Sequence, residues 1–301
     1  MAFVVAPDVS DRRPIPQDIR VQLAHAAVAS LAAHAFISAL ILKGPAMDAS
    51  VSPPGRASSD VDVLVAPDEL GPWLSLLAQH GWRPIDRFET GSSFEHSQTF
   101  HHDVWGHLDV HRRVPGIGAD PAVAFRQLWD RRTEAVVAGC AIPVPEPAAQ
   151  ALILCLHAAR SFGSPRAAQD LAFAWTSATP ARQSEILAWV TALDAQLGWA
   201  AVTGHLDDFR DDPAYRLWVV ASRGGTRLEE WRARIAVAPS ASAKLRTAAR
   251  AVLVNTDSLA INLGRQPTTP EVLAALGRRA RIALWETVSG LVQRLRGEGR
   301  G

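Results

Sequence analysis

The sequence predicts an α+β fold, with a mixed sheet and flanking helices in the first half of the chain and helices alone in the second. Three observations lead to this prediction. Short apolar segments with the patterning of strands recur up to about residue 145 and then stop. Around and after them, apolar residues repeat at the spacing of helices. The length of 301 residues suits two domains, which we place at residues 1–145 and 146–301.

The first domain opens with a predicted helix at residues 16–34, where apolar side chains recur at helical spacing after Pro16. An apolar run at residues 36–42 predicts a buried strand that ends in a loop. Alternation of polar and apolar residues at 60–65 predicts a second strand. A further helix is expected from about residue 67 to about residue 80.

The remaining strand signals lie before residue 145. Residues 94–101 and 105–113 predict a hairpin or two neighbouring strands, and residues 135–144 predict a smaller hairpin around Gly139. From residue 146 onward these patterns disappear. An amphipathic helix at residues 149–159 begins a series of helical runs that are separated by Pro or Gly.

The composition indicates a globular protein. Hydrophobic residues make up 48% of the chain and charged residues 20%, which excludes disordered, collagen-like and coiled-coil classes for the chain as a whole. The two cysteines, Cys140 and Cys155, are too few for a disulfide framework and suit a reducing compartment. No uncharged run reaches the roughly 18 residues of a membrane span. We therefore expect a cytoplasmic protein with no membrane span.

The net charge of +1 hides a difference between the two halves. Residues 1–145 carry 12 basic and 16 acidic side chains, whereas residues 146–301 carry 19 basic and 14 acidic ones. This distribution suits an acidic, metal-holding first domain and a basic second domain that faces phosphates or an anionic partner. For the basic helix at residues 278–296 we favour a solvated surface over contact with RNA or a membrane.

Two carboxylates in the second predicted strand are the strongest functional signal. Asp60 and Asp62 share one face of this strand, about 6.5 to 7 Å apart, while the valines between and after them take the other face. Neighbouring ionised carboxylates repel each other and are costly to bury, and a divalent cation removes both penalties. Hard oxygen ligands favour Mg²⁺ or Mn²⁺ over zinc.

A third carboxylate lies on a later strand. Asp109 and His111 share a face of the segment 106–111, so a strand placed beside the first would bring Asp109 against Asp60 and Asp62. Three carboxylates on neighbouring strands can hold two ions about 3.5 to 4 Å apart, as in-line phosphoryl transfer requires. We expect His111 to lie behind the ligands or on the side of the acceptor.

The loop before these strands predicts phosphate binding. Lys43 is one of only two lysines, the other being Lys244, and it follows a buried strand directly before Gly44. Glycine allows backbone N–H groups to approach an anion, and the lysine amine reaches phosphate as a point charge. Arg56 adds a planar donor that suits bidentate phosphate binding. We expect Lys43, Gly44 and Arg56 to bind a nucleotide.

Together these motifs resemble a family of uncharacterised bacterial nucleotidyltransferases of the polymerase-β-like superfamily. The resemblance rests on LILKG, then Arg56, SDVDVLV and LDVH, followed by LCLHAA and DLA, from about residue 40 to residue 174. It implies a polymerase-β-like mixed sheet with flanking helices and an all-helical C-terminal domain that supports the acceptor or the nucleotide. It also implies transfer of a nucleoside monophosphate from a nucleoside triphosphate such as ATP to an acceptor hydroxyl, with release of pyrophosphate.

The resemblance also implies roles for single residues. Asp60 and Asp62 would be ligands of Mg²⁺ or Mn²⁺ that place the triphosphate. Asp109 would share the metal and help to deprotonate the acceptor. Lys43 and Gly44 would correspond to the phosphate loop.

Several alternatives stay open at this level. The basic C-terminal half suits a toxin-like enzyme that modifies RNA or protein, and a non-catalytic nucleotide sensor would keep the same fold. The acceptor, whether small molecule, peptide or RNA, and the oligomeric state are not predicted. His107, Asp109 and His111 on one strand face make a weaker zinc hypothesis. His157 is expected either to pack in the core or to contact Asp170 between the domains.

Overall fold

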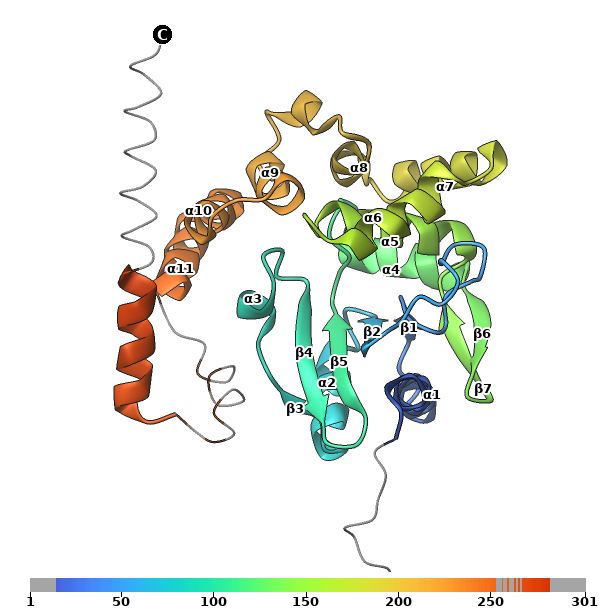
Figure 1. Cartoon of the computed structure of the whole chain (residues 1–301), viewed down its shortest axis with the longest axis horizontal. Helices are drawn as coiled ribbons and strands as arrows, with labels where there is room; N and C mark the ends of the chain where they lie inside the picture. Colours follow the sequence, from blue (N-terminus) through green and yellow to red (C-terminus); the bar gives the residue numbers. More distant parts are fainter. Residues whose placement is uncertain are drawn as a thin grey trace, which may run out of the picture.

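The computed structural model describes residues 15–252, 256, 259, 263, 265 and 267–281 (Figure 1). Its strands form a five-stranded mixed sheet and a separate two-stranded hairpin. The strands are β1 (Ala39–Ile41), β2 (Asp60–Val65), β3 (Arg83–Pro84), β4 (Ser97–His102), β5 (Gly106–His111), β6 (Thr133–Val137) and β7 (Cys140–Val144). The helices of this part are α1 (Gln17–His34), α2 (Leu70–Gln79), α3 (Phe88–Gly91) and α4 (Pro121–Asp130).

The sheet has the strand order β1-β2-β5-β4-β3. Strands β2 and β5 are parallel, and all other neighbours are antiparallel. In the parallel pair, Asp60 lies opposite His107 and Asp62 lies opposite Asp109. Chain segments nearly 50 residues apart in sequence therefore place two of the predicted carboxylates side by side in the middle strands.

Alternation along β2 explains how one strand serves both the core and the carboxylates. Val61, Val63 and Val65 are fully buried and pack in one cluster with apolar side chains of β5, α1 and α2. Asp60 and Asp62 point to the other face. A buried valine contributes about 1.5 to 3 kcal/mol relative to an exposed one, so the register that buries the valines also positions the carboxylates.

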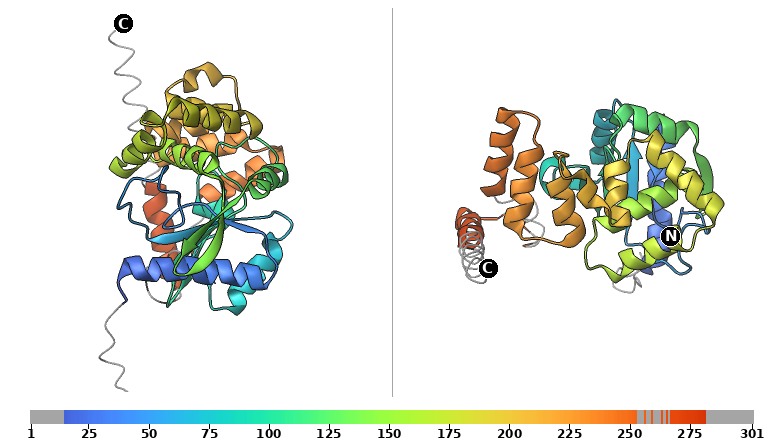
Figure 2. Two further views of the ribbon diagram at one scale, coloured as in Figure 1. Left: turned by 90° about the vertical axis from the view of Figure 1, so that its right-hand side faces the viewer. Right: turned by 90° about the horizontal axis from the view of Figure 1, so that it is seen from above.

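The later part of the chain is helical among its described residues. Its elements are α5 (Pro147–Ala159), α6 (Pro165–Leu171), a π-helical turn η2 (Ala172–Thr176), α7 (Pro180–Ala192), α8 (Gln196–Thr203), a 3-10 turn η3 (Leu206–Phe209), α9 (Tyr215–Arg223), α10 (Arg227–Val237) and α11 (Ala241–Val252). Residues 269–281 are helical as well. Seen from above in Figure 2, α10 and α11 (orange) lie to one side of the part that carries the sheet. The predicted α+β architecture, with a mixed sheet followed by helices, is confirmed.

Helix α5 joins the sheet to these helices. It is buried along most of its length, and Leu152 and Leu156 belong to the same apolar cluster as Leu40 and Leu64 of the sheet. Figure 1 shows α5 above the strands, with α6 and α7 beside it. Since this core crosses residue 145, the two predicted domains pack on one another, and their boundary stays a prediction.

The elements differ from the sequence prediction mainly at their ends. The strand predicted at residues 36–42 is only β1 (Ala39–Ile41), because Phe36 adopts a left-handed conformation, with φ of 55°, just after α1. Phe36 is 91% exposed and so does not join the buried strand. Helix α4, which the sequence did not predict, begins at a cap where the Asp120 side chain accepts hydrogen bonds from two backbone N–H groups.

No helix among the described residues is long and apolar enough to cross a membrane. Both cysteines, Cys140 and Cys155, are free thiols. Of the basic C-terminal segment, residues 278–281 lie in the described helix, whereas Arg294 and Arg296 lie outside the described residues.

Candidate active site

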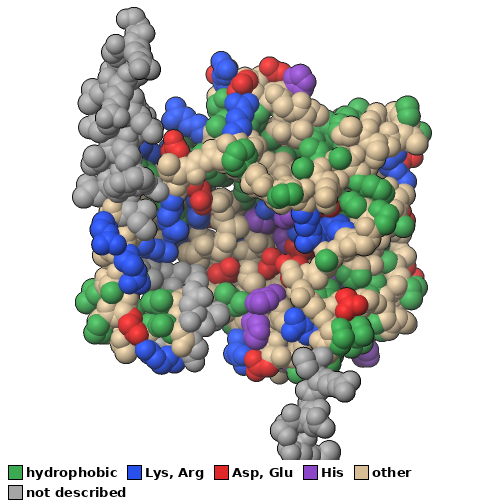
Figure 3. All heavy atoms as spheres, in the orientation of Figure 1, with side chains coloured by type: hydrophobic (Ala, Val, Ile, Leu, Met, Phe, Trp, Pro, Cys, Tyr) green, Lys and Arg blue, Asp and Glu red, His purple; other side chains and the backbone are tan. Residues whose placement is uncertain are grey.

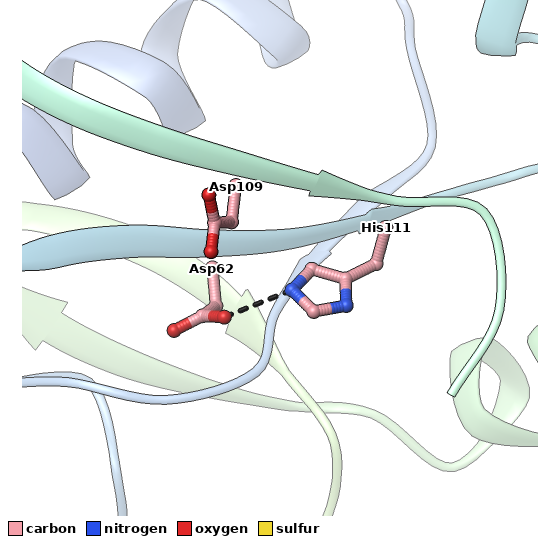
Figure 4. A group of neighbouring side chains, drawn as sticks. All are labelled: Asp62, Asp109 and His111. Atoms are coloured by element: carbon pink, nitrogen blue, oxygen red, sulfur yellow. Dashed lines mark hydrogen bonds and ion pairs between the residues drawn. The ribbon is translucent and has the colours of Figure 1, made fainter. Parts of the chain in front are cut away.

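The three predicted carboxylates lie on the two middle strands and line one cavity of about 190 Å³. The ligand atoms of Asp62, Asp109 and His111 lie within 4.8 Å of one another, and Figure 4 shows these side chains gathered beside β2 and β5. Asp60 lies two residues before Asp62 and lines the same cavity without belonging to this tight group. Its carboxylate accepts a hydrogen bond of 3.4 Å from Ser59.

Asp62 is a buried carboxylate with two nitrogen partners. The Nζ of Lys43 lies 3.0 Å from its Oδ1, and the Nε2 of His111 lies 2.8 Å from the same oxygen. Burial acts to raise the pKa of Asp62, but Lys43 and His111 together outweigh it and hold this pKa well below its usual range. Asp62 is therefore ionised at neutral pH even though it is only 5% exposed.

Asp109 experiences the opposite balance. Burial raises the pKa of Asp109, and the charge of neighbouring Asp62 raises it further, while His111 acts to lower it. The positive charge near Asp62 and Asp109 is thus too small to balance both carboxylates when both are ionised. His111, expected near the ligands or on the acceptor side, contacts Asp62 directly, and its Nδ1 is buried without a hydrogen-bond partner.

The loop of Lys43 and Gly44 is held by a residue that the sequence analysis missed. Gly44 has φ of 91°, and a Cβ there would lie 2.5 Å from the Nε2 of His25. His25, fully buried in α1, lies 3.2 Å from the carbonyl oxygen of Lys43 through that nitrogen, and 2.8 Å from the Val21 carbonyl through Nδ1. The signal available in the sequence was a histidine among the apolar positions of the helix predicted at residues 16–34.

Arg56 lies in the wall of the cavity, in a closed ion pair. Its Nε and Nη2 donate hydrogen bonds of 2.8 and 2.9 Å to the two carboxylate oxygens of Asp170. The side chains are 8% and 3% exposed. The Nε and Nη2 edge of the planar donor expected to face a phosphate is therefore used within the protein. His157, for which Asp170 was a possible partner, instead has its Nδ1 3.4 Å from the Nζ of Lys43.

Charged side chains gather where α5 and α6 approach the strands. In Figure 3, basic, acidic and histidine side chains meet in a hollow near the middle of the drawn face. The 190 Å³ cavity is lined by both parts of the chain, with Lys43 and the carboxylates on one side and residues of α5 and α6 on the other. His107, a member of the zinc hypothesis, lies outside the tight group and packs against His101 with ring centroids 5.1 Å apart.

The donor set suits a hard divalent cation. Asp60, Asp62 and Asp109 offer carboxylate oxygens, which Mg²⁺ and Mn²⁺ prefer. The raised pKa of Asp109, which burial and the charge of Asp62 cause, indicates a shortage of positive charge that a cation would relieve. The residues present therefore fit such an ion.

Comparison with known proteins identifies the family of this chain. The sequence model of a family described as "Uncharacterised nucleotidyltransferase" matches residues 17–205, which include the carboxylates, Lys43, Arg56 and the helices that close the cavity. The chain belongs to this family. The protein is thus a nucleotidyltransferase, as the sequence motifs predicted. No curated protein matches the chain.

Three solved structures are similar over most of their own length. They are the lincosamide antibiotic adenylyltransferase LnuA bound to lincomycin (16% identity, 61% of this chain and 99% of that one, TM-score 0.32), the antibiotic-resistance factor ANT(2'')-Ia (17%, 65% and 94%, TM-score 0.37), and an antigenic nucleotidyltransferase-like protein from Paracoccidioides brasiliensis (14%, 64% and 95%, TM-score 0.39). At these values the similarity is distant.

Proposed function

We propose that this nucleotidyltransferase transfers a nucleoside monophosphate from a nucleoside triphosphate to an acceptor hydroxyl and releases pyrophosphate. The observation that carries the proposal is the single cavity in which Asp60, Asp62 and Asp109 lie beside Lys43, in a chain of this family. A bond forms between the acceptor oxygen and the α-phosphorus. The bond from that phosphorus to the oxygen bridging to the β-phosphorus breaks, and the electron pair leaves with pyrophosphate.

The protein's part in this step is positioning and charge balance. Asp60, Asp62 and Asp109 would hold Mg²⁺ or Mn²⁺, which neutralises the phosphate oxygens when bound. Asp109, which lines the same cavity, would accept the proton of the acceptor hydroxyl. His111 orients the carboxylate of Asp62 through the 2.8 Å hydrogen bond.

Lys43 has two roles in this proposal. In the protein alone it neutralises Asp62 at 3.0 Å. With a nucleotide present, the same amine lies close enough to the carboxylates to bind a phosphate, and Gly44 lets the backbone approach it. Arg56 supports the site mainly through Asp170, because that carboxylate occupies its Nε and Nη2.

The test is transfer of label from α-phosphate-labelled nucleoside triphosphates. The purified protein is incubated with each labelled triphosphate, Mg²⁺ or Mn²⁺, and a cell extract separated into small molecules, RNA and protein. We expect one fraction to become labelled, with equimolar pyrophosphate. Label in the RNA or protein fraction with steep salt dependence would indicate a toxin-like enzyme instead of a small-molecule acceptor.

The matched control for substitution of a carboxylate in the cavity is D103N. Asp103 is an exposed carboxylate paired with Arg83, away from the cavity, so this variant should transfer label at the wild-type rate. Nucleotide binding without pyrophosphate release under any metal and acceptor fraction would contradict the proposal and favour a non-catalytic sensor.

A further inference from the structure

A second cavity adjoins the carboxylates. It has a volume of about 670 Å³ and shares Ser161 and Ser164, at the corner between α5 and α6, with the carboxylate cavity of about 190 Å³. Pockets that hold small molecules are about 300 to 1,000 Å³. The smaller cavity is below this range, and the larger one offers the additional space that a substrate at the carboxylates would need.

The walls of this second cavity carry more positive than negative charge. Arg160, Arg227 and Arg234 line it together with a single acid, Glu230. Glu230 is already engaged, since its Oε1 accepts a 2.7 Å hydrogen bond from Ser93 and lies 3.7 Å from Arg234. The cavity therefore favours an anionic ligand group.

Arg160 has no counter-ion among the described residues. It follows α5 directly, and its Nη2 lies 3.3 Å from the Nδ1 of His157. Among the described residues no carboxylate comes within ion-pair distance of it, and its Nε is buried with no hydrogen-bond partner. Burial lowers the pKa of Arg160 to about 10, while the charges of Asp62 and Asp109 act to raise it.

Arg56, in the same region, has a carboxylate partner within the protein. Both oxygens of Asp170 accept hydrogen bonds from Arg56, which leaves that carboxylate fully paired. Arg160, a half-buried residue, has no such carboxylate among the described residues, although removing a charge from water is costly unless it is paired. It lines the larger cavity and contacts His157, which lines the carboxylate cavity, so this unpaired charge stands where the two cavities meet.

We propose that Arg160 binds a phosphate group of a substrate in the 670 Å³ cavity beside the carboxylates. The inference rests on the proposed function, because it assigns a substrate group to the same site. The phosphate belongs either to the triphosphate tail of the nucleotide or to a phosphorylated acceptor. Ser164 also lines the cavity, and because its hydroxyl oxygen accepts a hydrogen bond from the Ala167 N–H, its own proton can be donated to a ligand.

The test is binding of inorganic pyrophosphate to the whole protein in the presence of Mg²⁺, measured by calorimetry. The variants are R160M, which removes the charge at similar length, and R160K, which keeps a charge in case R160M does not fold. The matched control is R83M, because Arg83 is an exposed arginine paired with Asp103. We expect R160M to weaken binding at least about tenfold, R160K to weaken it less, and R83M to leave it unchanged.

A competition arm separates the two sources of phosphate. Loss of pyrophosphate binding when a non-hydrolysable nucleoside triphosphate is added indicates the nucleotide tail, and persistence of Arg160-dependent binding indicates a phosphorylated acceptor. Both results support the proposal. Wild-type affinity for pyrophosphate and for the triphosphate in both R160M and R160K would overturn it. Because binding is measured without turnover, absence of label transfer would refute the proposed function and leave this inference standing.

Discussion

Two buried ion pairs differ in how completely each partner is satisfied. Asp170 receives one hydrogen bond on each oxygen from Arg56, so that pair is closed. Asp62 receives Lys43 and His111 on the same oxygen, Oδ1, and lies beside a second carboxylate, Asp109. Similar burial thus accompanies two arrangements. The closed pair joins the loop of Arg56 to α6, and the open pair, in the function proposed above, leaves carboxylate oxygen available to a ligand.

The largest expected effect comes from D62N. Removing this charge should lower label transfer by at least about a thousandfold, since positioning and charge neutralisation supply most of the catalysis. The free energy of unfolding should also fall, since the loss of the charge paired with Lys43 and His111 outweighs the relief of repulsion with Asp109. Initial rates and urea unfolding measure the two effects. Wild-type turnover in D62N would remove Asp62 from the mechanism.

R56M should act mainly on the stability of the fold. It leaves the Asp170 carboxylate, 3% exposed, without its partner, and breaking a buried pair costs about 3 to 5 kcal/mol of stability. Urea unfolding of R56M, D170N and the double variant should show that the two single losses do not add. Wild-type stability combined with a raised KM for the nucleotide would instead make Arg56 a substrate-binding residue.

Alanine substitutions at two glycines, Gly44 and Gly55, test the phosphate loop. G44A forces an alanine to φ of 91° and against His25, whereas G55A has φ of 72° with no atom within 4 Å of the new Cβ. Left-handed backbone alone costs about 1 to 2 kcal/mol, so G55A should lose about that much and G44A more, with reduced turnover in G44A only. Equal losses in stability and full activity in both would show that the His25 contact does not matter.

The smallest effect expected for any single group is the pH dependence of the free energy of unfolding. Burial lowers the pKa of His25, His96 and His157, so the unfolded chain binds protons near pH 6.5 that the folded chain does not. The free energy of unfolding should therefore fall as pH drops from 7.5 to 6, with a limiting slope of about 1.4 kcal/mol per pH unit for each group. Asp86, whose pKa burial raises to about 6, opposes the trend within this range, because it is already half-protonated in the folded chain at pH 6.

H96Q provides the check on this pH dependence. Urea unfolding at pH 7.5, 6.5 and 6 should give a shallower dependence in this variant than in the wild type, because one of the three groups is gone. Identical slopes would show that His96 binds its proton equally in both states. A rise in stability with falling pH would contradict the account of all three histidines.

Sequence reasoning was strongest where local pattern and chemistry coincide. The alternation at 60–65 defined β2 to the residue, and the face shared by Asp60 and Asp62 followed from it. Placement of Asp109 beside Asp62 needed the parallel pairing of β2 with β5, which the motif suggested but no local pattern determines.

Other contacts could not be predicted because they join distant segments. The Arg56 and Asp170 pair spans 114 positions, and nothing near Arg56 in sequence distinguishes a phosphate ligand from a buried ion pair. The contact of His25 with the Lys43 carbonyl depends on how α1 packs beneath the loop. The unpaired state of Arg160 is a property of its surroundings in space.

The most direct test of the central claim is Mn²⁺ binding, measured by electron paramagnetic resonance with a non-hydrolysable nucleoside triphosphate present. We predict that wild type and D170N bind Mn²⁺ and that D62N binds it at least about tenfold more weakly, because Asp62 is one of the three carboxylates proposed to hold the ion and Asp170 is not. Wild-type Mn²⁺ affinity in D62N, or loss of binding in a folded D170N, would contradict it.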